Sequence, residues 1–154
     1  MGLTGSFTGG CLCGAVRYEV SGEPRLSLLC HCRMCQRASG APFSAILFMS
    51  ADQVTITQGQ TRALVFSPRS NRHVCDGCGA PLFFTRDNRP ELRGLYVGSL
   101  DDPSGFQPKF HVCAESAMAW LDIRDDLPRY AEKPEGMTRP LAYDPISGSS
   151  KLQD

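Results

Sequence analysis

The chain has 154 residues, and its 16 lysines and arginines balance 16 aspartates and glutamates, so the formal net charge is zero. This length is typical of one domain with its own hydrophobic core. A neutral chain does not favour a broad nucleic-acid or membrane surface, because both need an excess of basic residues, and no apolar run approaches the roughly 20 residues of a membrane helix.

The first ten residues contain neither the basic region nor the apolar region of a signal peptide. We therefore expect a reducing, cytoplasmic location. In such a compartment the eight cysteines are expected to bind metal or take part in catalysis. Four disulfides, or scattered free thiols, are the alternative interpretations.

Short runs rich in β-branched and aromatic residues, separated by glycine and proline, predict strands along most of the chain. These strands cover residues 16–20, 26–29, 45–49, 54–57, 63–66, 82–85, 92–97 and 110–113. Eight short strands in one domain predict an all-β sandwich or open barrel. One short helix is expected over residues 32–39, because Gly40 can cap it and Pro42 prevents its continuation.

Seven of the eight cysteines fall into three tight clusters, which are Cys11 and Cys13, then Cys30, Cys32 and Cys35, then Cys75 and Cys78. Thiols one or two residues apart can converge on one small soft ion. Zinc takes four thiolates in a closed structural site and three protein ligands in an open reactive site. Because seven divides into four and three, we predict two zinc ions, one of them with a vacant position.

The segment from Cys75 to Gly79 has the form of a zinc knuckle, in which Gly77 and Gly79 let backbone amides turn toward sulfur. Its natural partner is the pair Cys11 and Cys13. Four thiolates would make this site closed and structural, with a contribution to folding on the order of 10 kcal/mol. We expect this zinc to be required for the fold.

The second site has three cysteines within six residues, namely Cys30, Cys32 and Cys35. They can share one face if Cys32 opens a helix. Three thiolates leave a fourth position for water or an incoming thiol, which an open zinc would deprotonate. We expect these three residues to hold the reactive zinc.

Cys113 is left over, and it is interpreted as a buried free thiol or as a fourth ligand that closes the second site. His31 lies between two ligands and should point away from the metal, so it is interpreted as a residue that supports the site or lines a pocket, with metal ligation as the alternative. His73 is interpreted as a strand residue or as support for the closed site. His111 is a candidate acid, base or hydrogen-bond donor in a pocket, with a structural histidine as the alternative.

From residue 132 onward the composition shifts toward proline, glycine and serine. This change is typical of an extended tail. We therefore expect one zinc-binding domain over residues 1–131 and a C-terminal tail over residues 132–154.

The cysteine clusters and their surroundings closely resemble the glutathione-dependent formaldehyde-activating family, which includes the centromere protein V domain. The resemblance covers roughly residues 7–134 and is carried by residues 9–18, 35–43, 75–83, 97–103 and 127–130. It implies a mainly β, complex zinc-bearing fold of the Mss-four-like type. Cys113 is a departure, because the family more often has an aromatic or aliphatic residue there.

Carried over residue by residue, the resemblance implies that Cys11, Cys13, Cys75 and Cys78 bind the structural zinc. It further implies that Cys30, Cys32 and Cys35 bind the second zinc, near the site for the thiol. The activity it implies is that of a carbon–sulfur lyase, which joins or splits glutathione and formaldehyde through S-hydroxymethylglutathione. The partners are then glutathione or a related thiol and a small aldehyde.

Two functions follow from these observations. In the first, glutathione binds the open zinc as a thiolate and attacks an aldehyde to give a hemithioacetal, and Arg33, Arg37 or Arg17 binds its carboxylates. Solvated surface arginines are the alternative interpretation of these three residues. In the second, the protein is a thiol carrier or a protein-interaction module whose zinc ions only hold the fold.

Overall fold

Two sheets form the framework of the protein, which we describe from a computed structural model covering residues 2–132, 142–143 and 150–151. The three-stranded sheet has the order β1-β2-β5, and the seven-stranded sheet has the order β10-β3-β4-β9-β8-β7-β6. The strands are β1 (Ser6–Gly10), β2 (Arg17–Ser21), β3 (Leu26–Cys30), β4 (Ser44–Ser50), β5 (Val54–Gln58), β6 (Thr61–Ser67), β7 (Ser70–Cys75), β8 (Pro81–Arg86), β9 (Leu92–Tyr96) and β10 (Phe110–Val112).

All pairings in the two sheets are antiparallel except one. Strand β10 runs parallel to β3, with Val112 opposite Cys30. A further antiparallel pair joins β11 (Ala142–Tyr143) to β12 (Ser150–Lys151). The rest of the expected tail lies outside the described residues, so the domain boundary near residue 131 stays a prediction.

A single α-helix, α1 (Arg33–Ser39), occurs in the described part of the chain. Cys32 is its N-cap and Gly40 its left-handed C-cap, so the predicted short helix is confirmed. Three 3₁₀ turns complete the structure, η1 (Ala51–Gln53), η2 (Val97–Ser99) and η3 (Ala114–Ser116). No helix among the described residues combines the length and apolar character needed to span a membrane.

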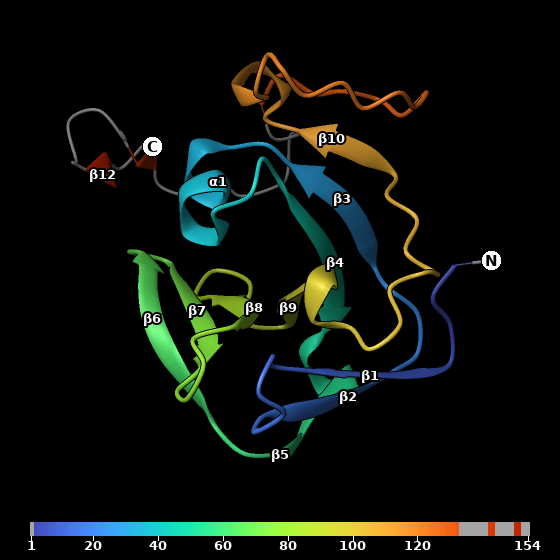
Figure 1. The fold of residues 1–154 in the computed structure, drawn as a ribbon, viewed down its shortest axis with the longest axis vertical. Coiled ribbons are helices and arrows are strands. Elements are labelled where there is room, and N and C mark those ends of the chain that lie inside the picture. Colours follow the sequence, from blue (N-terminus) through green and yellow to red (C-terminus); the bar gives the residue numbers. More distant parts are fainter. Residues whose placement is uncertain (1, 133–141, 144–149, 152–154) are drawn as a thin grey trace.

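Each face of the seven-stranded sheet packs against its own core, because side chains alternate along a strand. On β4, Leu47 and Met49 belong to the core shared with β2, whereas Ile46 and Phe48 belong to the core shared with α1. Figure 1 shows α1 at the end of the molecule opposite β1, β2 and β5. The mainly β fold expected from the sequence is confirmed.

The two cores separate the cysteine clusters. Cys11 and Cys75 are buried in the core beneath the three-stranded sheet, and Cys30 and Cys35 are buried in the core beneath α1. The clusters therefore lie on opposite faces of one sheet. A change at one of them need not disturb the other.

Candidate metal centres

The first cluster brings together two turns that are distant in the sequence. Cys11 and Cys13 follow β1, while Cys75 ends β7 and Cys78 lies in the turn before β8. The sulfur atoms of these four cysteines all lie within 4.8 Å of one another. The structure thus assembles the pairing that the sequence predicts.

Backbone amides point at the sulfur atoms in this cluster. The Val16 N–H donates to Cys11 Sγ at 3.2 Å, and this bond lowers the pKa of the Cys11 thiol to about 6. Gly14 and Gly79 have φ values of 80° and 74°, in the left-handed region that glycine adopts without strain. The sequence also suggested that Gly77 lets a backbone amide turn toward sulfur, but Gly77 does not have a positive φ.

The spacing of these sulfurs fits a tetrahedral zinc ion. Cys13 Sγ lies 3.6 Å from Cys11 Sγ and 3.7 Å from Cys75 Sγ. Four thiolates at about 2.3 Å from zinc would be about 3.8 Å apart. A donor set made only of soft thiolates also suits zinc rather than magnesium or calcium. These residues fit a closed zinc site.

The second cluster is built where β3 leads into α1. Cys30 is the last residue of β3, Cys32 is the helix N-cap, and Cys35 lies in the first turn. Their sulfur atoms lie within 4.8 Å of one another. The Cys35 N–H donates to Cys32 Sγ at 3.3 Å, so the cap itself orients one thiol of the cluster.

Cys113 joins this second cluster, although sequence reasoning treated it mainly as a leftover thiol. Its side chain makes hydrogen-bonding contacts with Cys30 and Cys32 and packs against the core that contains Cys30 and Cys35. The contacts with Cys113 and Cys30 lower the pKa of the Cys32 thiol, while those with Cys30 and Cys32 raise the pKa of Cys113. Cys113 therefore lies beside the second cluster, although its sulfur is not among those that all lie within 4.8 Å of one another.

Arg86 is a basic neighbour of the second cluster that the sequence gave no reason to select. Burial lowers the pKa of its guanidinium, and the nearby thiols Cys35, Cys30 and Cys32 oppose that change. The guanidinium also lies 5.6 Å from the ring centre of Phe84. A cation held in this position can offset the negative charge of several thiolates.

Two histidines and an aspartate form a chain beside the second cluster. His31 Nε2 lies 2.8 Å from His111 Nδ1, and His111 Nε2 lies 2.9 Å from the Asp125 carboxylate. Arg129 donates to the same carboxylate at 2.8 Å. The side chain of His31 contacts His111 rather than the two cysteines that flank it in the sequence. Asp125 was not selected from the sequence, and Arg129 entered only as part of the segment 127–130 that carries the family resemblance, with no role assigned to it.

A pocket of about 190 Å³ opens beside this chain of polar residues. His31, His111, Asp122 and Arg129 line it together with the apolar Leu121 and Ile123. His111 is therefore a pocket residue, as one interpretation of the sequence expected. The pocket is smaller than the roughly 300 Å³ at which ordinary small-molecule sites begin, so it suits a small ligand or part of a larger one.

The remaining candidates from the sequence are one histidine and three arginines. His73 lies on β7 between Thr61 and Thr85, whose hydroxyls are 3.1 and 3.2 Å from its ring nitrogens, which is a structural role. Arg17 pairs with Asp101 and lies near Cys11, on the face away from the second cluster. Arg33 and Arg37 are exposed on α1, where they flank the second cluster.

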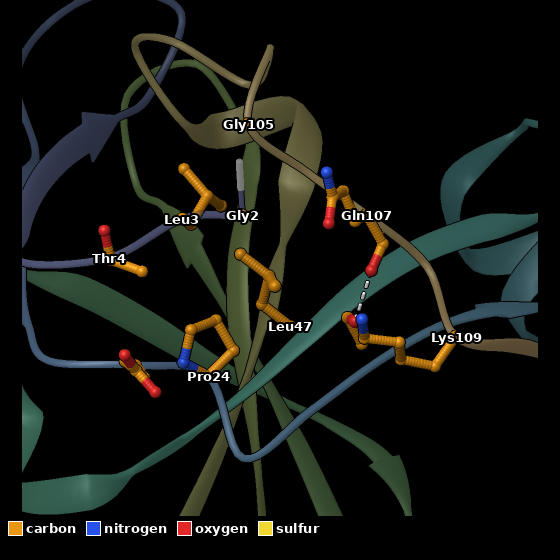
Figure 2. Close-up of a pocket in the computed structure, with 10 residues that line it drawn as sticks. Gly2, Leu3, Thr4, Pro24, Leu47, Gly105, Gln107 and Lys109 are labelled. Carbon is orange, nitrogen blue, oxygen red and sulfur yellow. Dashed lines mark hydrogen bonds between the residues drawn. The ribbon is translucent and has the colours of Figure 1, made fainter.

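A second pocket, of about 250 Å³, lies near the start of β3, at the other end of this strand from Cys30. Figure 2 shows Leu3, Pro24, Leu47 and Lys109 around it, with a hydrogen bond of 2.6 Å from Ser27 to the Gln107 carbonyl in its wall. No cysteine or histidine lines this pocket. This pocket is therefore separate from both cysteine clusters.

Comparison with known proteins agrees with this arrangement. A protein of Halomonas elongata is 25% identical over 75% of this chain and 79% of its own length. Proteins of Fusarium vanettenii and Penicillium rubens are 30% and 32% identical over 72% and 70% of this chain. All three carry the provisional name glutathione-dependent formaldehyde-activating enzyme. The matched region spans only 65% and 61% of the two fungal proteins.

The fold is also similar to a crystal structure of a Rhodobacter sphaeroides protein, with a TM-score of 0.51 and 24% identity over 61% of this chain and 87% of that one. Residues 6–116 match the family described as glutathione-dependent formaldehyde-activating enzyme. This region contains both cysteine clusters and Cys113. The chain therefore belongs to the glutathione-dependent formaldehyde-activating enzyme family.

Proposed function

We propose that this protein holds two zinc ions, one structural and one reactive, and that it joins or splits a thiol and a small aldehyde as a carbon–sulfur lyase. The thiol is glutathione or a related molecule, and the aldehyde is formaldehyde or a similar small carbonyl compound. The cytoplasm is the expected location, because thiols stay reduced there. Family membership and the chemistry of the second cluster support this proposal.

Solvent has access to the second cluster, and this access is the main support for the proposal. Cys30 and Cys35 are buried, but Cys32 and Cys113 are only half-buried. A small thiol can therefore approach the point at which the sulfur atoms converge. Arg33 and Arg37 are exposed on α1, the helix that also carries Cys35, and are the proposed partners for the carboxylates of the thiol.

Each side chain has a definite part in the proposed reaction. Cys30, Cys32 and Cys35 would hold the zinc ion, and Arg86 would offset the negative charge of their thiolates. Zinc bound there would stabilise an incoming thiol in its thiolate form near neutral pH. The sulfur of that thiol would form a bond to the aldehyde carbon, and the carbonyl oxygen would take up the proton that the thiol lost, to give the hemithioacetal. The reverse sequence splits the adduct, and neither direction needs an oxidant.

The alternative function is a non-catalytic thiol carrier or protein-interaction module. The contact of Cys113 with Cys30 and Cys32 favours it, because four thiolates close a zinc site and closed sites are usually structural. Under this alternative the protein would bind a thiol without changing the rate of its reaction with an aldehyde, or would bind no thiol at all.

Calorimetric titration of the zinc-loaded protein tests the proposed function. We expect reduced glutathione to bind and S-methylglutathione to give no heat, because a methylated sulfur cannot become a thiolate. Exchange spectroscopy on formaldehyde and glutathione then separates enzyme from carrier, since an enzyme accelerates formation and breakdown of the adduct. Failure of both compounds to bind, or equal binding of both, would contradict a thiol site at the metal.

A further inference from the structure

We propose that Cys113 is the fourth ligand of the second metal and that an incoming thiol replaces it. Ligation by Cys113 needs only a metal ion at the second cluster. Its replacement rests on the function proposed above, so the two claims can fail separately.

The sheet places Cys113 at the cluster. Strand β10 runs parallel to β3 with Val112 opposite Cys30, so both strands end side by side and Cys113 follows directly. The Cys113 thiol contacts Cys30 and Cys32, which lie more than 80 residues earlier in the chain. A fourth thiol therefore lies beside the three whose sulfur atoms converge within 4.8 Å, where a metal ion could draw it in as a ligand.

The backbone at Cys113 adopts a conformation that is unfavourable for a residue with a side chain. Its φ of 55° and ψ of 40° lie in the left-handed region, and it is the one non-glycine residue with a positive φ among those described. This conformation costs a β-carbon-bearing residue about 1–2 kcal/mol. Glycine would avoid the cost, so the presence of cysteine suggests a role for its sulfur.

Hydrogen bonds fix the turn that carries Cys113. Its N–H donates to the Glu132 carbonyl at 3.3 Å, and its own carbonyl accepts from Ser116 at 3.0 Å. The buried amide of Gln36 then donates to the carbonyls of His31 and Ser116, at 2.7 and 2.9 Å. Gln36 thus ties α1, which carries Cys35, to the turn that carries Cys113.

The position of Cys113 also suits a ligand that can leave. Cys30 and Cys35 are buried and fixed by β3 and α1, whereas Cys113 is half-buried on a turn. An incoming thiol would bind as a thiolate, and Cys113 would leave as a thiol. The proton lost by the first is gained by the second, so the metal keeps four thiolates and no redox step is involved.

Cadmium-113 NMR of the cadmium-loaded protein, in buffer free of added thiols, tests this ligation. Cadmium takes the place of zinc in thiolate sites, and its chemical shift moves to lower field with each additional sulfur ligand. We expect two resonances for the unaltered protein, both in the range of four-sulfur sites. A second resonance in the three-sulfur range would overturn the proposal without any variant.

The variant Cys113→Gly removes the sulfur and accepts the left-handed backbone. We expect one resonance to move upfield to the three-sulfur range while the other stays in place, and β-mercaptoethanol to restore the first position. The control variant Ala114→Gly, in the same turn, should leave both resonances unchanged. Unchanged resonances in Cys113→Gly would overturn the ligation. An upfield shift that glutathione and β-mercaptoethanol both fail to reverse would support ligation but contradict replacement by a thiol.

Discussion

Replacing Cys75 with serine is expected to leave the protein without a stable fold. Cys75 is 1% exposed, it ends β7, and its sulfur belongs to the cluster that joins two turns 62 residues apart. A structural zinc site of this kind contributes on the order of 10 kcal/mol, whereas a domain has a total stability of about 5–15 kcal/mol. Circular dichroism and the zinc content of the purified variant measure the result.

The neighbouring variant Asp76→Asn is the matched control. Asp76 lies in the same turn but is exposed and pairs with Arg62 at the surface. Surface ion pairs contribute little to stability, so this variant should fold and keep its zinc. A Cys75→Ser protein with unchanged melting temperature and full zinc content would refute a structural role for the first cluster.

Replacing Cys35 with serine is expected to remove the second metal and the binding of glutathione while the fold survives. Three ligands of this cluster come from one short segment that β3 and α1 already order, so the metal here constrains far less chain than the first one does. Placing a hydroxyl in the core beneath α1 should cost about 1–3 kcal/mol, which a domain with its structural zinc can tolerate.

Zinc analysis, thermal unfolding and calorimetry with glutathione together read out this variant. The control is Ser39→Ala on the same helix, which loses a hydrogen bond of 2.7 Å to the Cys35 carbonyl and one of 3.2 Å from the Ala41 N–H. It should keep both metals and bind glutathione. Collapse of the Cys35→Ser fold would mean that both metals are structural, and retained glutathione binding would mean that the thiol site lies elsewhere.

The sequence could predict which cysteines converge in the two clusters because short cysteine spacings restrict where the sulfur atoms can lie. It also predicted eight strands and the helix, whose N-cap and C-cap residues are local signals. It placed no strands at β11 and β12, in the expected tail, and within the two sheets it missed β1 and β7. Strand β1 is short and ends in two glycines, and β7 is mostly polar but pairs with a strand on each side.

Cys113 and Arg86 could not be selected in the same way. Cys113 reaches the second cluster only because β10 pairs with β3, and a single sequence gives no signal for that pairing. Arg86 lies at the end of β8, and only the packing of β8 beneath α1 brings its charge near the thiols. Contacts that depend on tertiary packing between distant strands are the part of the site that the sequence leaves open.

Counting the metals by native mass spectrometry tests the central claim most directly. We expect two zinc ions per chain. A chelator should remove the second-cluster ion first from a folded protein, and unfolding should accompany the loss of the first-cluster ion. A chain that carries fewer than two zinc ions when zinc is supplied in excess, or whose mass shows disulfides in place of metal, would contradict the account.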